Sequence, residues 1–230
     1  MFGGILDFIF PPRCGGCRRA GTWFCAACAA TATAPILSLC PACHRWTSVH
    51  PCPLCPTSGW RPASIRGLLR LEGPVQEAIH RLKYRNRPRL AEPLASLALQ
   101  LAASSPMPLT EPPVASLVLA VPLHPHRQRQ RGYNQAEAVA QALTTSRSAD
   151  PVRLPGRLAR PVATSPQVGR TGPDRRAAMA GAFSWTGPPP PAEIILVDDV
   201  VTTGATLLAA ADALHLAGAV EVHCLALAQG

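Results

Sequence analysis

The chain has 230 residues, of which 47% are hydrophobic and 15% charged, and its mean hydropathy is +0.12. This length suits one ordinary domain with a small appendage and leaves little room for two full-sized domains. No apolar run reaches the ~18 residues of a transmembrane helix. The apolar stretch 2–10 lacks the basic flank of a signal peptide. We therefore expect a cytoplasmic protein with no transmembrane segment.

The formal net charge is +9, and every one of the 22 basic residues except Lys83 is an arginine. Ten arginines against three acidic residues lie between residues 124 and 176. Positive charge concentrated in one segment favours a polyanionic partner, either a phosphorylated ligand or nucleic acid. A general arginine bias in the composition is the alternative explanation.

Eight of the nine cysteines fall in the first 55 residues, in four CxxC pairs separated by seven, eleven and eight residues. A CxxC turn places two sulfurs on one side, and two such turns complete a four-thiolate shell around Zn²⁺. Eight ligands therefore predict two structural zinc sites. Disulfides are the alternative, which the cytoplasmic assignment disfavours. The candidate ligands are Cys14, Cys17, Cys25, Cys28, Cys40, Cys43, Cys52 and Cys55.

The short intervals suggest that the first CxxC pair shares a metal with the second, and the third with the fourth; an interleaved arrangement is left open. Residues 1–60 offer few core residues, so the metal is expected to supply much of their folding energy. Because this segment holds only four arginines, it is not expected to form the main anion-binding surface. The ninth cysteine, Cys224, lies in an apolar strand-like run and is expected to be a buried structural thiol.

From residue 61 onward, helix and strand patterns alternate. Apolar runs predict strands over 65–71, 117–121, 152–154, 193–197 and 220–227. Helical spacing predicts helices over 75–84, 89–103, 133–145 and 205–216, with a long polar loop over 160–180. Apolar strands alternating with helices predict an α/β protein whose parallel sheet is covered on both faces. Residues 61–230 would form this domain and residues 1–60 a separate zinc-binding one.

The segment 193–207 combines a buried strand, two aspartates (Asp198 and Asp199), a turn, and a Thr-Thr-Gly-Ala-Thr run that opens a helix. Ligands bind at strand ends in open α/β sheets, and a helix N-terminus offers N–H groups to a phosphate. Gly204 lets the backbone approach closely, and the carboxylates can accept sugar hydroxyls directly or through Mg²⁺. An ordinary turn with a helix cap is the alternative, but it does not explain this order of residue types.

This segment resembles the phosphoribosyl-pyrophosphate (PRPP) motif of type I phosphoribosyltransferases. The resemblance implies that Asp198 and Asp199 bind the ribose 2′- and 3′-hydroxyls, with Mg²⁺ accompanying PRPP. It implies that the 5′-phosphate is held by Thr202, Thr203, Gly204, Ala205 and Thr206.

Residues 121–137 (VPLHPHRQRQRGYNQAE) resemble a signature of the ComF family, whose double zinc ribbon resembles the four CxxC pairs. Residues 80–95 and 160–183 resemble further ComF segments, so the likeness covers nearly the whole chain. Arg127 and Arg131 would supply cations for the pyrophosphate, followed by neutral hydrogen bonds from Asn134 and Gln135. Lys83 stands where the family usually has a lysine, and a solvated helix end is its alternative interpretation. His124 and His126 are either proton-transfer groups or ordinary loop histidines.

The segment 160–183 corresponds to the loop that closes over PRPP in phosphoribosyltransferases and excludes water. Its Thr164, Gln167, Arg175 and Arg176 fit that pattern. Ala178 stands where the family usually has Asn, which puts loop closure in question.

These features predict a type I phosphoribosyltransferase fold with an N-terminal zinc ribbon, and a ComF-family protein that binds PRPP and takes part in natural competence. If it is an enzyme, the catalytic residues are Asp198, Asp199, Arg127 and Arg131. The alternatives are a phosphoribosyltransferase with an unidentified acceptor in nucleotide metabolism, a PRPP sensor without turnover, and a non-catalytic adaptor. The adaptor would bind single-stranded DNA through arginine-rich loops and contact proteins of the DNA-uptake machinery. Its candidate stacking residues are Tyr84, Tyr133, Trp46 and Trp60.

Overall fold

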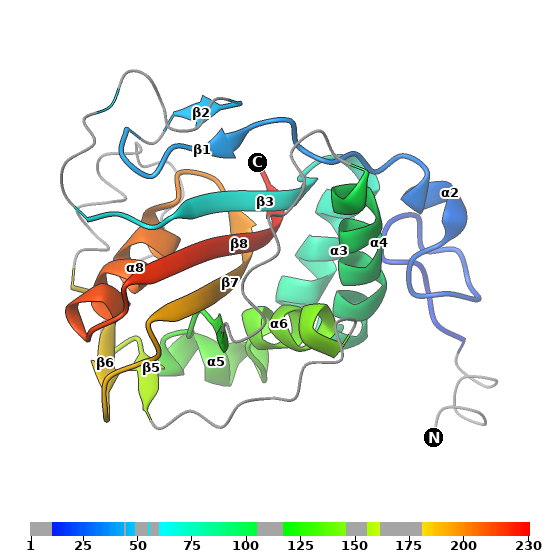
Figure 1. The fold of residues 1–230 in the computed structure, drawn as a ribbon. Helices are drawn as coiled ribbons and strands as arrows, with labels where there is room; N and C mark the ends of the chain where they lie inside the picture. The colour runs from blue at the N-terminus through cyan, green and yellow to red at the C-terminus, as the bar shows by residue number, and fades with distance from the viewer. Residues whose placement is uncertain are drawn as a thin grey trace.

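A computed structural model describes residues 11–43, 45–48, 55, 60–104, 117–145, 156–161 and 181–230. Its centre is a six-stranded sheet with the strand order β2-β1-β3-β8-β7-β4, and helices lie on both sides of it (Figure 1). The fold is therefore α/β with a mostly parallel sheet, as the alternation of patterns predicts.

The four central strands are parallel to one another. They are β3 (Ser64–Arg70), β8 (Glu221–Gln229), β7 (Glu193–Val201) and β4 (Leu117–Ala120). Strands β7 and β8 are largely buried, which accounts for their nearly continuous apolar sequence. Four of the five predicted strands are thereby confirmed. The candidate strand 152–154 lies outside the described residues.

The edge of the sheet beyond β3 is made by two short strands of the cysteine-rich segment, β1 (Ser38–Leu39) and β2 (Trp46–Thr47). Strand β1 pairs antiparallel with β3, Leu39 opposite Ile65. Both side chains are buried in the same core cluster. The cysteine-rich segment thus contributes to the central sheet, and the division of the chain at residue 60 stays a prediction.

Each face of the sheet has its own helices. One face packs against α3 (Gly73–Tyr84), α4 (Ala91–Ala103) and α6 (Gln135–Thr145), and the other against α8 (Ala205–Leu216). Along β7 the side chains alternate between these layers, because successive strand residues point to opposite faces. Ile194 and Leu196 lie in the α8 layer, whereas Ile195 and Val197 lie in the α3–α4–α6 layer.

The remaining described elements are short. They are α2 (Ala26–Ala29), η1 (Pro88–Leu90), α5 (Pro125–Arg131) and a two-stranded antiparallel sheet of β5 (Arg157–Ala159) with β6 (Ser184–Thr186). Helix α5 stands where a loop is predicted. Pro125 opens it, the His124 side chain caps it, and Gly132 closes it at φ +80°.

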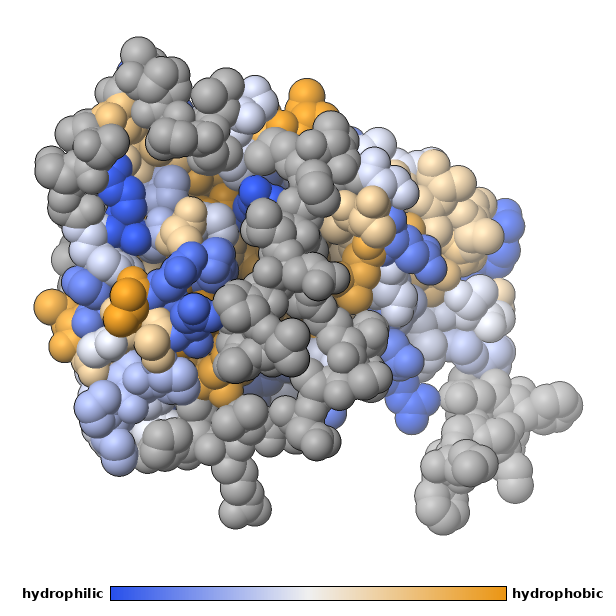
Figure 2. All heavy atoms as spheres, viewed as in Figure 1, coloured by the Kyte–Doolittle hydropathy of each residue, from blue (hydrophilic) through white to orange (hydrophobic). Residues whose placement is uncertain are grey.

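No helix in the described part of the chain is long and apolar enough to span a membrane. On the face drawn in Figure 2, the hydrophobic patches of the described residues are small and separated by hydrophilic ones. This agrees with the few large hydrophobic side chains that are exposed there, such as Ile36 and Leu216.

Candidate functional site

A cavity of about 160 Å³ lies beyond the carboxyl end of β7, where the chain turns into α8. Gly204 makes the turn at φ +72°, and its carbonyl accepts the first helical hydrogen bond, from the Leu208 N–H at 2.9 Å. The N-terminal N–H groups of α8 are therefore directed to this end of the sheet, where an anion would bind. The lining residues include Asp198, Thr202, Thr203, Gly204, Ala205, Thr206, Arg127 and Arg160.

The underside of this turn is in contact with the cysteine-rich segment. A Cβ atom on Gly204 would lie 2.4 Å from Cδ2 of Leu39, which is 1% exposed. Glycine is therefore required twice at this position, for the positive φ and for the close approach of Leu39. Leu39 directly precedes Cys40, so a candidate zinc ligand is linked through one buried side chain to residues 202–206, the candidate phosphate loop.

The two adjacent aspartates lie on opposite faces of β7, because the strand extends to Val201 rather than ending at residue 197. Asp198 lines the cavity. Asp199 is directed to the α3 layer, where its Oδ1 lies 2.9 Å from Nζ of Lys83. Its other oxygen, Oδ2, is buried without a hydrogen-bond partner among the described residues. That oxygen is therefore a buried acceptor on the α3 side of β7, outside the residues that line the cavity.

The electrostatics of the cavity centre on Asp198. Burial raises its pKa to about 7, and the charge of Asp199 adds to the increase. The charges of Lys83 and Arg160 oppose it, as does the hydrogen bond that the Asp199 N–H donates to Asp198 Oδ1 at 2.8 Å. The carboxyl group therefore changes its protonation near neutral pH, which suits a group that binds or releases a proton with its ligand.

Arg127 and Arg160 supply positive charge on the cavity wall. Burial lowers the pKa of Arg160, the nearby Arg127 lowers it further, and Asp198 raises it. The Arg160 guanidinium lies 5.3 Å from the ring centroid of Phe183. Arg160 is a site residue that no sequence motif indicates. It directly follows β5 and is one of several arginines in this part of the chain.

Arg131 is not among the residues that line the cavity. Its guanidinium lies 5.0 Å from the ring centroid of Tyr84, which is 60% exposed. The Tyr84 ring also contacts His80, with 4.9 Å between the ring centroids. The structure therefore brings Arg127 to the phosphate loop and places Arg131 at an exposed aromatic side chain.

Several other predicted candidates have structural contacts. The Asn134 amide donates to the Val121 carbonyl at 3.1 Å, and its oxygen accepts from the Ala136 N–H at the start of α6. His124 Nδ1 accepts from the His126 N–H at 3.2 Å. Gln135 is buried, and its side-chain oxygen has no hydrogen-bond partner in the described region.

The candidate stacking aromatics other than Tyr84 are partly buried and pack against the rest of the fold. Trp46 and Trp60 pack against the α8-side core, and Trp60 also stacks on His215 with 4.0 Å between centroids. The Tyr133 hydroxyl donates to the Leu82 carbonyl, and burial raises its pKa to about 12. Of these four residues, only Tyr84 presents a largely exposed ring.

The cysteines form two groups whose sulfurs lie within 4.8 Å of one another. Cys14, Cys17, Cys25 and Cys28 form one group, and Cys40, Cys43 and Cys55 form the other. Neighbouring pairs thus come together as the short intervals suggest. Cys52, the expected eighth ligand, lies outside the described residues. Cys224 is buried in the core, and burial raises its pKa, as expected of a structural thiol.

The sulfur spacing fits zinc. The Cys14–Cys28, Cys17–Cys25 and Cys40–Cys55 Sγ distances are each 3.7 Å. A tetrahedral ion with Zn–S bonds of ~2.3 Å requires S···S edges of about 3.8 Å. Burial alone would raise the pKa of Cys14, but hydrogen bonds from Cys25 and neighbouring residues lower it to about 6. Burial and its hydrogen bonds with the neighbouring sulfurs raise the pKa of Cys28 in the same group to about 12. The sulfur spacing, rather than the charge of the thiols, therefore indicates that both groups can hold zinc.

Residues 158–230 match the family model of the phosphoribosyl transferase domain. This part of the chain is therefore similar to a phosphoribosyl transferase domain. The matched region contains Arg160, β7, the phosphate loop, α8 and β8, and so most of the cavity described above. The match does not distinguish the ComF family from other phosphoribosyltransferases. Among curated proteins, none matches the chain significantly.

The expected closing loop cannot be compared with this geometry. Thr164, Gln167, Arg175, Arg176 and Ala178 lie outside the described residues, so their roles stay predictions.

Proposed function

We propose that this chain is a ComF-type phosphoribosyltransferase that binds PRPP, with Mg²⁺, in the cavity at the end of β7. The observation that carries the proposal is the convergence of four features: the phosphate loop, Asp198, two arginines and a family match that spans most of them. We assign the 5′-phosphate to the turn 202–206, where the N–H groups of α8 and the threonine hydroxyls donate hydrogen bonds.

The two aspartates would act from different faces of β7. We assign one ribose hydroxyl to Asp198 within the cavity and the other to Asp199, whose buried Oδ2 has no hydrogen-bond partner among the described residues. Lys83 holds the other oxygen of Asp199 and so orients the carboxylate. Carboxylate oxygens are ligands that suit Mg²⁺, and the bound ion would neutralise charge on the pyrophosphate.

In the reaction, a nucleophile forms a bond to the anomeric carbon while the bond to the pyrophosphate oxygen breaks, and pyrophosphate leaves with the bonding electrons. Arg127 and Arg160 lie where they can stabilise the leaving charge by charge-assisted hydrogen bonds. Arg131, beside the exposed ring of Tyr84, is proposed to act at the rim. The nucleophile loses a proton as its bond to the anomeric carbon forms, and we propose that Asp198, with a pKa of about 7, accepts that proton.

We propose two structural zinc ions, the second completed by Cys52, and a division into domains at residues 1–60 and 61–230. We propose that the protein is cytoplasmic and takes part in natural competence, on the strength of the ComF resemblance. The alternatives are a PRPP sensor without turnover and a single-stranded-DNA adaptor that contacts the uptake machinery.

Pyrophosphate release from PRPP, measured with a panel of nucleobase acceptors, tests the enzyme proposal. We expect acceptor-dependent release, lowered about 10- to 100-fold in kcat/KM by Arg127→Gln, since one hydrogen bond to a charged group contributes ~1.5–3 kcal/mol. Arg129→Gln is the matched control, because Arg129 lies on the same helix, is exposed and does not line the cavity. Equal effects of the two substitutions would contradict the assignment of Arg127. PRPP binding without release would favour the sensor.

A further inference from the structure

A second and larger cavity, of about 570 Å³, lies between the first cysteine group and the C-terminal part of α3. It shares no lining residue with the phosphate-loop cavity. Its walls come from segments far apart in the sequence, the cysteine-rich turn at Arg13–Arg18 and the region from α3 to η1. The proposed function makes no use of this cavity.

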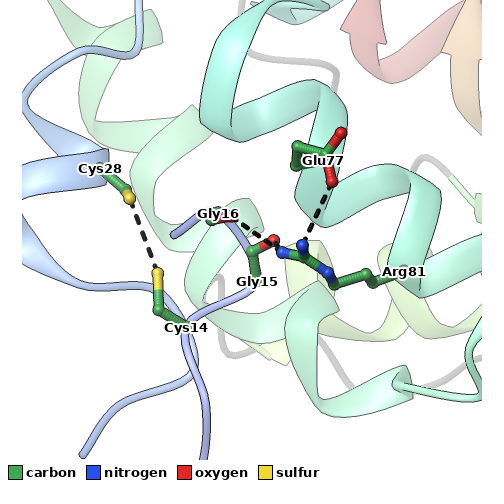
Figure 3. A network of polar contacts seen from close by, with 6 residues as sticks. All are labelled: Cys14, Gly15, Gly16, Cys28, Glu77 and Arg81. Carbon is green, nitrogen blue, oxygen red and sulfur yellow. Dashed lines mark hydrogen bonds and ion pairs between the residues drawn. The ribbon is translucent and has the colours of Figure 1, made fainter. Parts of the chain in front are cut away.

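The cavity is built on a fixed junction, drawn in Figure 3. The Arg81 guanidinium donates to the carbonyls of Gly15 and Gly16, the latter at 2.9 Å, and pairs with Glu77 at 3.2 Å. A Cβ atom on Gly15 would lie 2.7 Å from Cδ2 of Leu90, so the turn is seated closely against this region. Arg81 therefore fastens the cysteine-rich turn to α3, and the cavity exists before any ligand binds.

Four further arginines line this cavity: Arg13, Arg18, Arg85 and Arg87. All four are exposed, and none has an ion pair or a side-chain hydrogen bond with the described residues. Among the described residues, Glu77 is the one acidic side chain that lines the cavity, and it pairs with Arg81. A zinc ion held by four thiolates has a net charge of −2. The four arginines carry +4, so the positive charge is larger. The cavity is therefore an unneutralised positive site, although the cysteine-rich segment alone is not expected to bind anions.

One wall of the cavity is aromatic. Trp23 is partly buried and lines the cavity, with the guanidinium of Arg89 5.8 Å from its ring centroid. An aromatic wall beside several arginines suits a ligand that carries both phosphate groups and a planar base. The volume lies within the ~300–1,000 Å³ range of small-molecule pockets.

We propose that this cavity binds a free nucleotide, its phosphates held by Arg18, Arg85 and Arg87 and its base against Trp23. A nucleotide fits better than a single strand of nucleic acid for two reasons. The arginines line one hollow from two sides, and the described lining residues offer one aromatic ring, whereas a strand is bound along a groove with successive stacking residues.

The test is a calorimetric titration of ADP into the full-length, zinc-loaded protein at low salt. We expect saturable binding, weakened about tenfold or more by Arg18→Gln and by Arg85→Gln/Arg87→Gln, since tenfold corresponds to ~1.4 kcal/mol. Arg19→Gln is the matched control and should bind as the wild type does. Arg19 is the exposed neighbour of Arg18 and does not line the cavity. Zinc content and melting temperature verify that each variant is folded.

This proposal does not depend on the PRPP site. An Asp198→Ala/Asp199→Ala variant, with the phosphate-loop site disabled, should bind ADP with unchanged affinity. The proposal is overturned if ADP does not bind the wild type, if the arginine variants bind it equally well, or if the aspartate variant loses it. It is also overturned if a 12-nucleotide single strand binds more tightly than ADP with the same dependence on Arg18, Arg85 and Arg87.

Discussion

Replacing Gly204 by alanine tests the link between the phosphate loop and the cysteine-rich segment. Gly204 has φ +72°, in the left-handed region, and a Cβ atom there would lie 2.4 Å from Cδ2 of Leu39. Left-handed backbone costs a non-glycine residue ~1–2 kcal/mol. The overlap costs a further ~1–3 kcal/mol as overpacking, because Leu39 is buried and cannot rotate into solvent. Gly204→Ala should therefore lower the free energy of unfolding by about 2–5 kcal/mol.

The two contributions can be separated with a double-mutant cycle, measured by urea denaturation. Leu39→Ala alone should cost about 2–5 kcal/mol by removing a fully buried leucine. In the double variant the overlap is absent, so the combined loss should be smaller than the sum by about 1–3 kcal/mol. Additive losses, or a Gly204→Ala variant within about 0.5 kcal/mol of the wild type, would contradict the predicted overlap with Leu39.

Three further results are expected. Lys83→Met should lower the free energy of unfolding, measured by urea denaturation at pH 8, by about 2–3 kcal/mol. The substitution leaves the carboxylate of Asp199, which is 5% exposed, without its cation. Unchanged stability would contradict the buried ion pair. The pKa of Asp198 is about 7, and the proposed contacts with PRPP and Mg²⁺ require its ionised form. The affinity for PRPP·Mg²⁺, measured by calorimetry, should therefore fall as the pH decreases below 7, by up to about tenfold per pH unit. The decrease should be smaller in Asp198→Asn, and equal slopes in the two proteins would contradict this role of Asp198. Metal analysis should find two zinc ions per chain in the wild type and one in either Cys14→Ser or Cys43→Ser. A wild-type protein with one ion would contradict one of the two zinc sites, and a protein with none would contradict both.

The fold was largely predictable because its main elements bury apolar sequence. Strand β8 and helix α8 follow the apolar patterns closely, and β7 begins where its pattern predicts. Helix α5 was missed because it buries no residue and therefore shows no apolar periodicity. Its signals are local instead, a proline at its start and Gly132 at its end.

Parts of the site depend on tertiary placement that no local pattern reveals. The phosphate loop could be located because strand, acids, threonines and glycine are contiguous. Arg160 comes from the residues after β5, and the divergence of Asp198 and Asp199 follows from β7 continuing past its predicted end. Similarly, Arg18 and Arg85 share a cavity only because Arg81 fastens two distant segments together.

The most direct test of the central claim is a calorimetric titration of PRPP with Mg²⁺ into the zinc-loaded protein, alongside Asp198→Ala/Asp199→Ala. We expect the wild type to bind PRPP saturably and the double variant to lose this binding. Absence of binding by the wild type, or equal binding by both proteins, would contradict a PRPP site at the end of β7.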